Sequence, residues 1–276
     1  MSKKIILFLL VTLTAYNGYS QKKSKVKGSR NVTNEITEIE SFERIVIGDD
    51  FEIKLTQGLT PSVEINADDN LHDVIEFSVQ NGSLTFNKTK RIVSSKTLEI
   101  IVTAVESLNT IELKDDGEIS DLSSIKSDNL TLITKGSSKA FLTLRTDLFK
   151  LVNGDKSDNK LNVTAKKVTL ELSENSKTEA LINATDIEID MYQRSTAKIE
   201  GDTDNLELRL DNNSQFTGKK LTAKDCFLTI EARAEASVEA TKTLTIEALG
   251  STETYIYGNP KIDLKKFEDS AILRKK

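Results

Sequence analysis

The chain has 276 residues, a formal net charge of −5, one cysteine, one histidine and no tryptophan. This mildly acidic balance gives no electrostatic reason to expect a nucleic-acid partner. A single cysteine excludes an intramolecular disulfide, and a single histidine argues against Ser-His-Asp, Cys-His and multi-histidine zinc chemistry.

Residues 1–20 have the three parts of a secretory signal peptide. Lys3 and Lys4 precede an apolar run from Ile5 to about residue 15, and the small residues Gly18 and Ser20 follow. The apolar run is too short for a membrane-spanning helix, and the sequence has no second long apolar segment. We therefore expect export, with cleavage after Ser20 and no transmembrane span.

Residues 21–41 are polar and begin with QKKSKVKGSR, which has five basic residues and no acidic one. We interpret this segment as a basic flexible linker. Contact with an anionic membrane surface is the alternative interpretation.

Residues 42–107 predict a β region that is less regular than the rest of the chain. Its segment FSVQNGSLTF places Asn81-Gly82 between alternating apolar residues, which predicts a hairpin with a two-residue turn. We expect this region to form a cap, because the first coil of a solenoid would otherwise expose its core and its strand edges.

From residue 108 to residue 276 the sequence repeats itself every 18 to 21 residues. One repeated position is always Leu or Ile: Ile111, Leu132, Leu151, Leu170, Ile189, Leu208, Leu228, Ile246 and Leu264. Six residues later the side chain is always small: Gly117, Ser138, Ser157, Ser176, Ser195, Ser214, Ala234, Thr252 and Ser270. A fixed period of this length is typical of a solenoid.

Apolar residues alternate within each repeat, as in VTLEL and IEIDM, and this period of two predicts strands. Two short strands and two corners in about 19 residues leave no room for a crossover helix. We predict an all-β protein with a parallel β-helix of about nine coils over residues 108–276, preceded by the irregular cap. The Leu/Ile column should fill the interior. The small column should occupy a tight corner, where serine supports the turn and is not a nucleophile.

Candidate catalytic groups are few. His72 is expected in a surface loop, and Cys226 falls in an inward column, so we expect a buried free thiol there. The sequence has no Gly-rich phosphate loop, no CxxC pair and no nucleotide-binding motif. We therefore expect a protein that is not an enzyme and that needs no cofactor, with a calcium ion as the one exception.

Four acidic residues on neighbouring strands suggest a calcium site. Glu171, Glu188, Asp190 and Glu207 occupy outward positions, so Glu188 should lie one coil from Glu207, and Glu171 one coil from Asp190. Like charges about 4.8 Å apart repel one another unless a cation such as Ca²⁺ bridges them. The alternative is a solvated acidic strip that is partly balanced by Arg209.

Three segments carry a resemblance to a known bacterial family. They are FERIVIG and FEIKLTQG within residues 42–58, NGSLTF at 81–86 and YIYGNPKI at 255–262. They resemble the family called "putative auto-transporter adhesin, head GIN domain", and the resemblance covers about 42–275. The Gly-Ser-Gly corners usual in that family are reduced here to Ser beside Asn, Asp or Lys. The resemblance implies a β-helical envelope protein of Gram-negative bacteria, and it supplies no catalytic residues.

The sequence thus predicts a non-enzymatic exported protein of the cell envelope or surface that acts in adhesion or as a scaffold. We expect it in the periplasm, on the outer-membrane surface or outside the cell. Its partner would be an envelope component, a cell surface or a glycan, with no nucleic acid involved and with peripheral membrane contact as an option. The alternative function is a calcium-assisted β-helix that binds or cleaves a polysaccharide.

Overall fold

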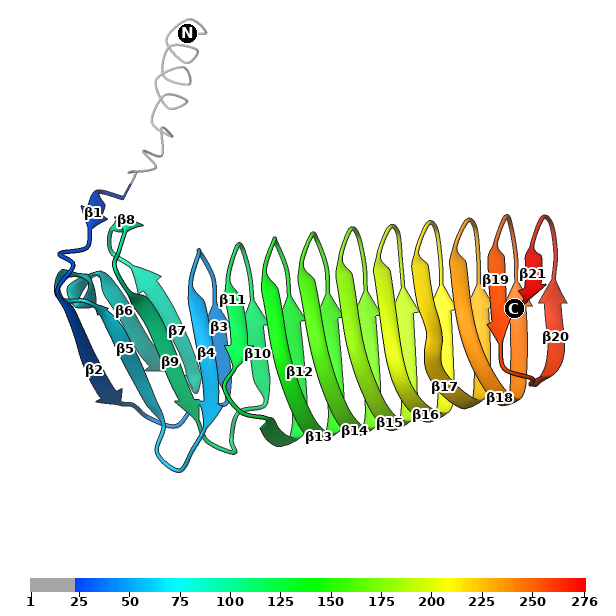
Figure 1. Cartoon of the computed structure of the whole chain (residues 1–276), viewed down its shortest axis with the longest axis horizontal. Coiled ribbons are helices and arrows are strands. Elements are labelled where there is room, and N and C mark those ends of the chain that lie inside the picture. The colour runs from blue at the N-terminus through cyan, green and yellow to red at the C-terminus, as the bar shows by residue number, and fades with distance from the viewer. Residues whose placement is uncertain (1–22) are drawn as a thin grey trace, which may run out of the picture.

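The structure is a computed structural model that describes residues 23–276. It is nearly all β, with 69% of residues in strands and 2% in helix, and a parallel β-solenoid of about nine turns dominates it (Figure 1). The predicted fold class and the period of roughly 19 residues per coil are confirmed. The predicted signal peptide lies outside the described residues.

Each regular coil has two faces, which are joined by a tight corner and by a bend. In β15 the buried side chains alternate through Thr178, Ala180 and Ile182, and then change phase to Ile187 and Ile189, which marks the bend. We call the segments that follow each corner the post-corner sheet, and the segments that precede it the pre-corner sheet. The strands of the regular rod are β10 (Thr110–Leu113), β11 (Glu118–Asp121), β12 (Ile125–Thr134), β13 (Lys139–Asn153), β14 (Asp158–Leu172), β15 (Lys177–Met191), β16 (Thr196–Leu210), β17 (Gln215–Ile230), β18 (Glu235–Ala248), β19 (Glu253–Tyr257), β20 (Lys261–Phe267) and β21 (Ile272–Lys275).

The aliphatic column lies in the interior, as predicted. Leu151 pairs with Leu170, Leu170 with Ile189, and Ile189 with Leu208, always in parallel register and with at most 1% of each residue exposed. Each side chain therefore contacts its equivalents in the coils on either side, which removes its apolar surface from water along the whole rod.

The corners form a second column. Residues with positive φ recur two positions before the small side chain: Asp115, Gly136, Asp155, Glu174, Gln193, Asn212, Ala232 and Gly250. Their carbonyls accept hydrogen bonds from the next coil, as Asp155 accepts one from the Asn175 N–H at 2.9 Å. At the last corner the small position is Ala271 and not Ser270, because a bulge shifts the register of β20 against β18 by one residue.

The solenoid begins before residue 108. β3 (Arg44–Ile47) and β4 (Glu52–Gln57) pair in parallel with β10 and β11, so residues 42–57 form a coil of the rod and not part of the cap. β7 (Ser83–Lys88) and β9 (Leu98–Ala104) then add to the outer edges of β3 and β4. The chain thus builds the layer beyond its first coil before it returns to continue the rod, and local periodicity does not reveal this crossover.

The remaining cap elements close the N-terminal end of the rod. β5 (Ser62–Asp68) pairs antiparallel with β9, and the 3₁₀ helix η1 (Asp69–Val74) buries Leu71 and Val74. β6 (Ile75–Gln80) and β7 form the hairpin predicted at Asn81-Gly82, where both turn residues have positive φ.

The described part of the expected linker is structured instead. β1 (Lys25–Lys27) pairs with β8 (Arg91–Ser94), and β2 (Val32–Glu38) pairs antiparallel with β5. β2 is a polar edge strand with mostly exposed side chains, which is why its sequence resembles a linker.

Asp68 anchors this edge of the cap. Its buried carboxylate accepts backbone hydrogen bonds from Arg30, Lys96 and Thr97. Burial raises the pKa of Asp68, but these hydrogen bonds outweigh that effect and leave the pKa below its usual range. The carboxylate thereby joins the segment before β2 to the segment before β9.

Among residues 23–276, no helix is both long enough and apolar enough to cross a membrane.

Candidate functional site

The register places the four predicted calcium ligands as the sequence indicated. Glu188 pairs with Glu207, and Glu171 pairs with Asp190, on the outer side of the pre-corner sheet. Burial and the negative charge of Glu188 raise the pKa of Asp190, and the nearby Arg209 opposes this effect. The four carboxylates therefore form a contiguous acidic strip.

Lysines from neighbouring coils balance two of these carboxylates. Lys150 Nζ lies 2.6 Å from the Glu171 carboxylate, and Lys167 Nζ lies 3.0 Å from that of Glu188. Within residues 23–276, no group of three or more His, Cys, Asp or Glu side chains is arranged to hold a metal ion. The calcium site stays a prediction, and the ion pairs favour the solvated strip. We did not predict the two lysines, because each contacts a glutamate one coil further along the rod.

The corner serines and the cysteine of the repeat are buried. Ser157, Ser176 and Ser195 lie at the corners with at most 1% exposed. The Ser157 hydroxyl is within hydrogen-bond distance of the Asn153 side chain and the Gly154 carbonyl in its own turn, and of the Thr134 carbonyl in the preceding coil. Cys226 is a buried free thiol, as predicted, and desolvation raises its pKa to about 12. A protonated and inaccessible thiol is a poor nucleophile.

His72 lies in η1 and not in the expected surface loop. Its side chain is mostly buried beneath β2, with Nε2 3.0 Å from Thr33 Oγ1 and Nδ1 3.6 Å from the Glu35 carboxylate. The imidazole therefore contacts the edge strand of the cap. The sequence pattern missed this position because β2 was interpreted as a linker.

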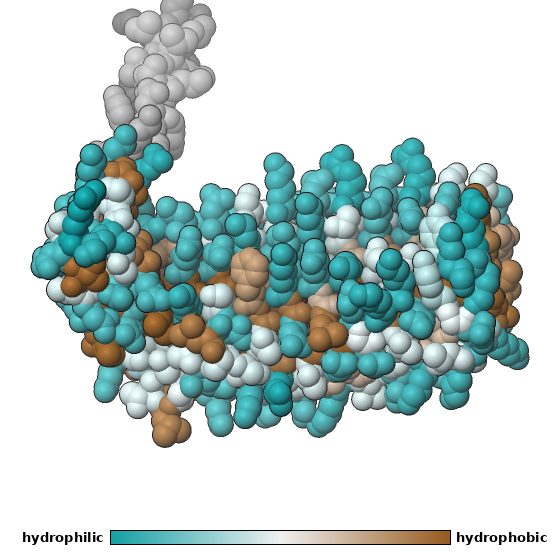
Figure 2. Space-filling view, in the orientation of Figure 1, coloured by the Kyte–Doolittle hydropathy of each residue, from teal (hydrophilic) through white to brown (hydrophobic). Residues whose placement is uncertain are grey.

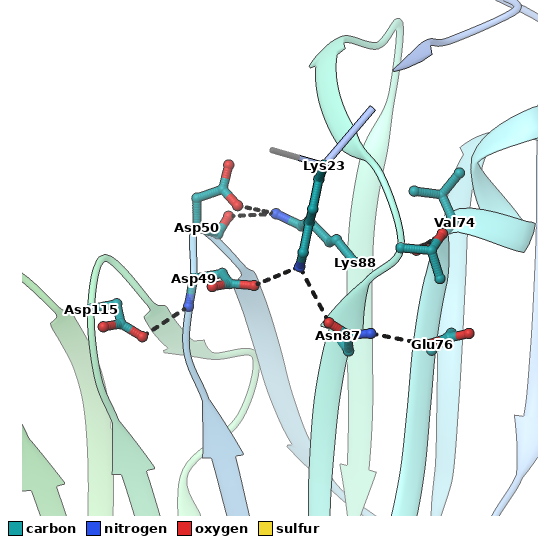
Figure 3. Close-up of polar contacts among 9 residues, drawn as sticks. Lys23, Asp49, Asp50, Val74, Glu76, Asn87, Lys88 and Asp115 are labelled. Carbon is teal, nitrogen blue, oxygen red and sulfur yellow. Dashed lines mark hydrogen bonds and ion pairs between the residues drawn. The ribbon is translucent and has the colours of Figure 1, made fainter. Parts of the chain in front are cut away.

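A charged cluster joins the cap to the first coil (Figure 3). The Lys88 ammonium, whose side chain is 7% exposed, pairs with the Asp50 carboxylate and lies 4.2 Å from the centroid of the Phe51 ring. Hydrogen bonding from Lys88 lowers the pKa of Asp50. Lys23 reaches Asp49 at 3.7 Å and Asn87 at 3.3 Å, so the described start of the chain also contacts this junction. The buried Lys88 ammonium thus has an opposite partner, which indicates a structural role.

The post-corner sheet carries an open groove of about 510 Å³ across several adjacent coils. Phe141 and Leu181 contribute apolar surface to its lining, and Lys160, Lys198 and Glu200 contribute charges. Leu181 is an exposed large hydrophobic residue that points away from the core. On the face of the rod shown in Figure 2, hydrophilic side chains lie along the upper and lower parts, and a band of hydrophobic and intermediate ones lies between them. Apolar groups framed by charged ones on a rigid sheet are typical of a binding surface.

The chain matches the family described as "putative auto-transporter adhesin, head GIN domain" over residues 41–181 and 158–260. The chain belongs to this family. The matched segments together span both the cap and most of the rod, so the resemblance inferred from three short segments is confirmed. No protein among the curated sequences matches the chain.

Solved structures of similar proteins share the fold. A putative adhesin from Parabacteroides distasonis is 15% identical, with a TM-score of 0.63 and coverage of 91% of this chain and 100% of that one. A putative adhesin from Parabacteroides merdae is 16% identical, with a TM-score of 0.61 and coverage of 91% and 99%. A structure described as a putative lipid binding protein from Parabacteroides distasonis is also 16% identical, with a TM-score of 0.59 and the same coverage. At this identity the likeness concerns the fold alone.

Proposed function

We propose that this protein is an exported, non-catalytic binding module of the cell envelope that acts in adhesion or as a scaffold. Membership of an adhesin-named family supports this function. The signal-peptide pattern at residues 1–20 supports export to the periplasm, the outer-membrane surface or the exterior.

The groove on the post-corner sheet is the observation that carries the proposal. Its backbone is fixed by parallel pairing between successive coils, so its side chains keep their spacing when a partner binds. A preorganised surface loses little conformational entropy on binding. The partner would be a cell-surface or envelope component that offers an apolar group between polar ones, such as a glycan or a protein segment.

The buried state of the corner serines and of Cys226 supports a function without covalent catalysis. The hydroxyls of these serines and the thiol of Cys226 are enclosed by their own coils.

A binding assay on intact envelopes tests the proposal. Cell fractionation should find the protein in an exported fraction, and the purified chain should bind envelope or cell-surface material in a saturable manner. Leu181→Asp should weaken this binding about tenfold or more, because it places a charge in the apolar part of the groove. Leu148→Asp is the matched control, since Leu148 is similarly exposed but lies outside the groove.

Equal binding by the two variants would contradict a role for the groove. Retention of the chain in the cytoplasm would contradict the exported function as a whole.

Calcium-dependent glycan recognition is the alternative function, and it would use the acidic strip. A glycan array with and without millimolar calcium separates the two functions. Because Lys150 and Lys167 balance Glu171 and Glu188, we expect calcium to change neither the array signals nor the melting temperature. A calcium-dependent signal that Glu188→Gln removes would favour the alternative.

A further inference from the structure

The two ends of the rod differ in how their cores are covered. At the N-terminal end, η1 covers the interior with Leu71 and Val74, which are at most 2% exposed. At the C-terminal end, every residue of β20 is exposed, including Ile262, Leu264 and Phe267 at 40–47%. Hydrophobic residues are visible at this end of the rod in Figure 2.

These exposed residues of β20 belong to the interior column of the solenoid. Ile262 pairs with Leu244 and Leu264 with Ile246, and both partners are fully buried. β20 pairs only with β18, and β21 only with β19, so both sheets end in open edges in the part of the chain that the structure describes. An open edge beside an uncovered apolar core is a template for pairing with another strand.

The sequence of β20 and the residue after it is complementary to itself in an antiparallel arrangement. Apart from Lys265 at the bulge, the outward side chains alternate in charge through Lys261, Asp263, Lys266 and Glu268. Within one chain Lys265 Nζ lies 2.9 Å from the Asp263 carboxylate and Lys266 Nζ lies 3.9 Å from that of Glu268, so pairing with a second copy exchanges these partners. When a second copy is related by a two-fold axis between residues 264 and 265, Lys261 faces Glu268 and Asp263 faces Lys266. The same register places Ile262 opposite Phe267 on the inner side. Opposite charges in such cross-strand positions fix both register and partner choice.

Two of the basic residues at the end of the rod, Arg274 and Lys276, contact their own chain. Arg274 Nε lies 4.0 Å from the Glu253 carboxylate, and Lys276 Nζ lies 5.0 Å from the centroid of the Tyr255 ring. These contacts reduce repulsion between the two ends. The end of the rod, about 23 Å along the strand and two sheets deep, offers an area on the order of 500 Å² per copy. A total near 1,000 Å² is at the lower limit for a specific interface.

We infer that the C-terminal end of the rod is an interface with a second copy of this chain, formed by antiparallel pairing of β20 across a two-fold axis. The resulting dimer is a rod of twice the length with a cap at each outer end. Head-to-tail assembly lacks a matching surface, because η1 and the polar strand β2 lie at the other end.

Analytical ultracentrifugation of the purified full chain tests the inference. We expect a reversible dimer at micromolar concentrations, and Ile262→Asp should weaken dimerisation at least tenfold, because in this register it places a charge opposite Phe267. Leu59→Asp is the control, since Leu59 is fully exposed in the loop between β4 and β5, far from this end. Circular dichroism of each variant verifies that the rod remains folded.

A charge exchange tests the register independently of Ile262. Asp263→Lys and Lys266→Asp should each weaken the dimer, because each creates like-charged pairs across the two-fold axis. The double variant restores opposite charges at both pairs across the axis and should dimerise more tightly than either single variant. A wild-type chain that stays monomeric at about 100 μM would overturn the inference. A double variant as weak as either single variant would overturn the proposed register.

Discussion

Replacement of Phe216 by alanine tests whether the coils are packed by matching large and small side chains in successive layers. Phe216 is 2% exposed in β17 and lies in register between Ala197 and Ala236. A Cβ atom added to Gly218 would lie 2.4 Å from the Phe216 ring. One coil thus contributes an aromatic ring where its neighbours contribute alanine, and its own glycine makes room for that ring.

We expect Phe216→Ala to lower the free energy of unfolding by about 4 kcal/mol. Loss of the buried apolar surface contributes about 2 kcal/mol. A cavity of about 100 Å³ contributes a similar amount at about 24 cal/mol per Å³ if it stays open. The cavity should stay open because Ala197 and Ala236 are too small to fill it, and parallel pairing on both sides holds the backbone of β17 in place.

Urea denaturation followed by circular dichroism measures this cost. Phe227→Ala is the matched control, because Phe227 points outward from the same strand with 37% of its surface exposed, and it should cost less than about 1 kcal/mol. Gly218→Ala should destabilise the wild-type chain, and that cost should fall by about half or more when Phe216 is alanine. Similar stability of the two phenylalanine variants, or an unchanged cost of Gly218→Ala, would refute size-matched packing.

Three further predictions concern buried charged and ionisable groups. In chemical denaturation, Asp50→Ala should destabilise the protein by about 2–3 kcal/mol and Lys88→Met by less than about 1 kcal/mol, because only the first variant leaves a buried ammonium without its carboxylate. Equal costs of the two variants would contradict this asymmetry. Cys226, with its pKa raised to about 12, should not react with a thiol reagent at pH 8 until denaturant is added, and rapid labelling of the native protein would show that the interior is accessible. The lowered pKa values of Asp50 and Asp68 stabilise the folded state above the unfolded pKa, and this contribution is lost as pH falls through the folded pKa. The melting temperature of the wild-type chain should therefore decrease when the pH is lowered below about 4, and it should decrease less in Asp68→Asn. An equal decrease in that variant would assign the effect to other carboxylates.

The sequence determines the regular part of this protein because each coil is stabilised by its immediate neighbours. The side chain of Leu170 has the same environment as those of Leu151 and Ile189, so the period of the sequence is also the period of the structure. The same reasoning predicts the interior position of Cys226 and the neighbouring positions of Glu188 and Glu207.

Only the tertiary structure decides how the non-repeating segments and the surface charges are paired. β2 has the polar composition of a linker, yet it forms a strand because β5 presents an open edge and Asp68 binds the backbone next to it. β3 pairs with β10 although more than 60 residues separate them, and no local pattern encodes that choice. Lys150 neutralises Glu171 for the same reason: the pair exists only because one coil lies on the next. Local alternation specifies which side of a strand is buried, whereas the free energy of covering an open edge or a charge depends on which segments meet in the folded chain.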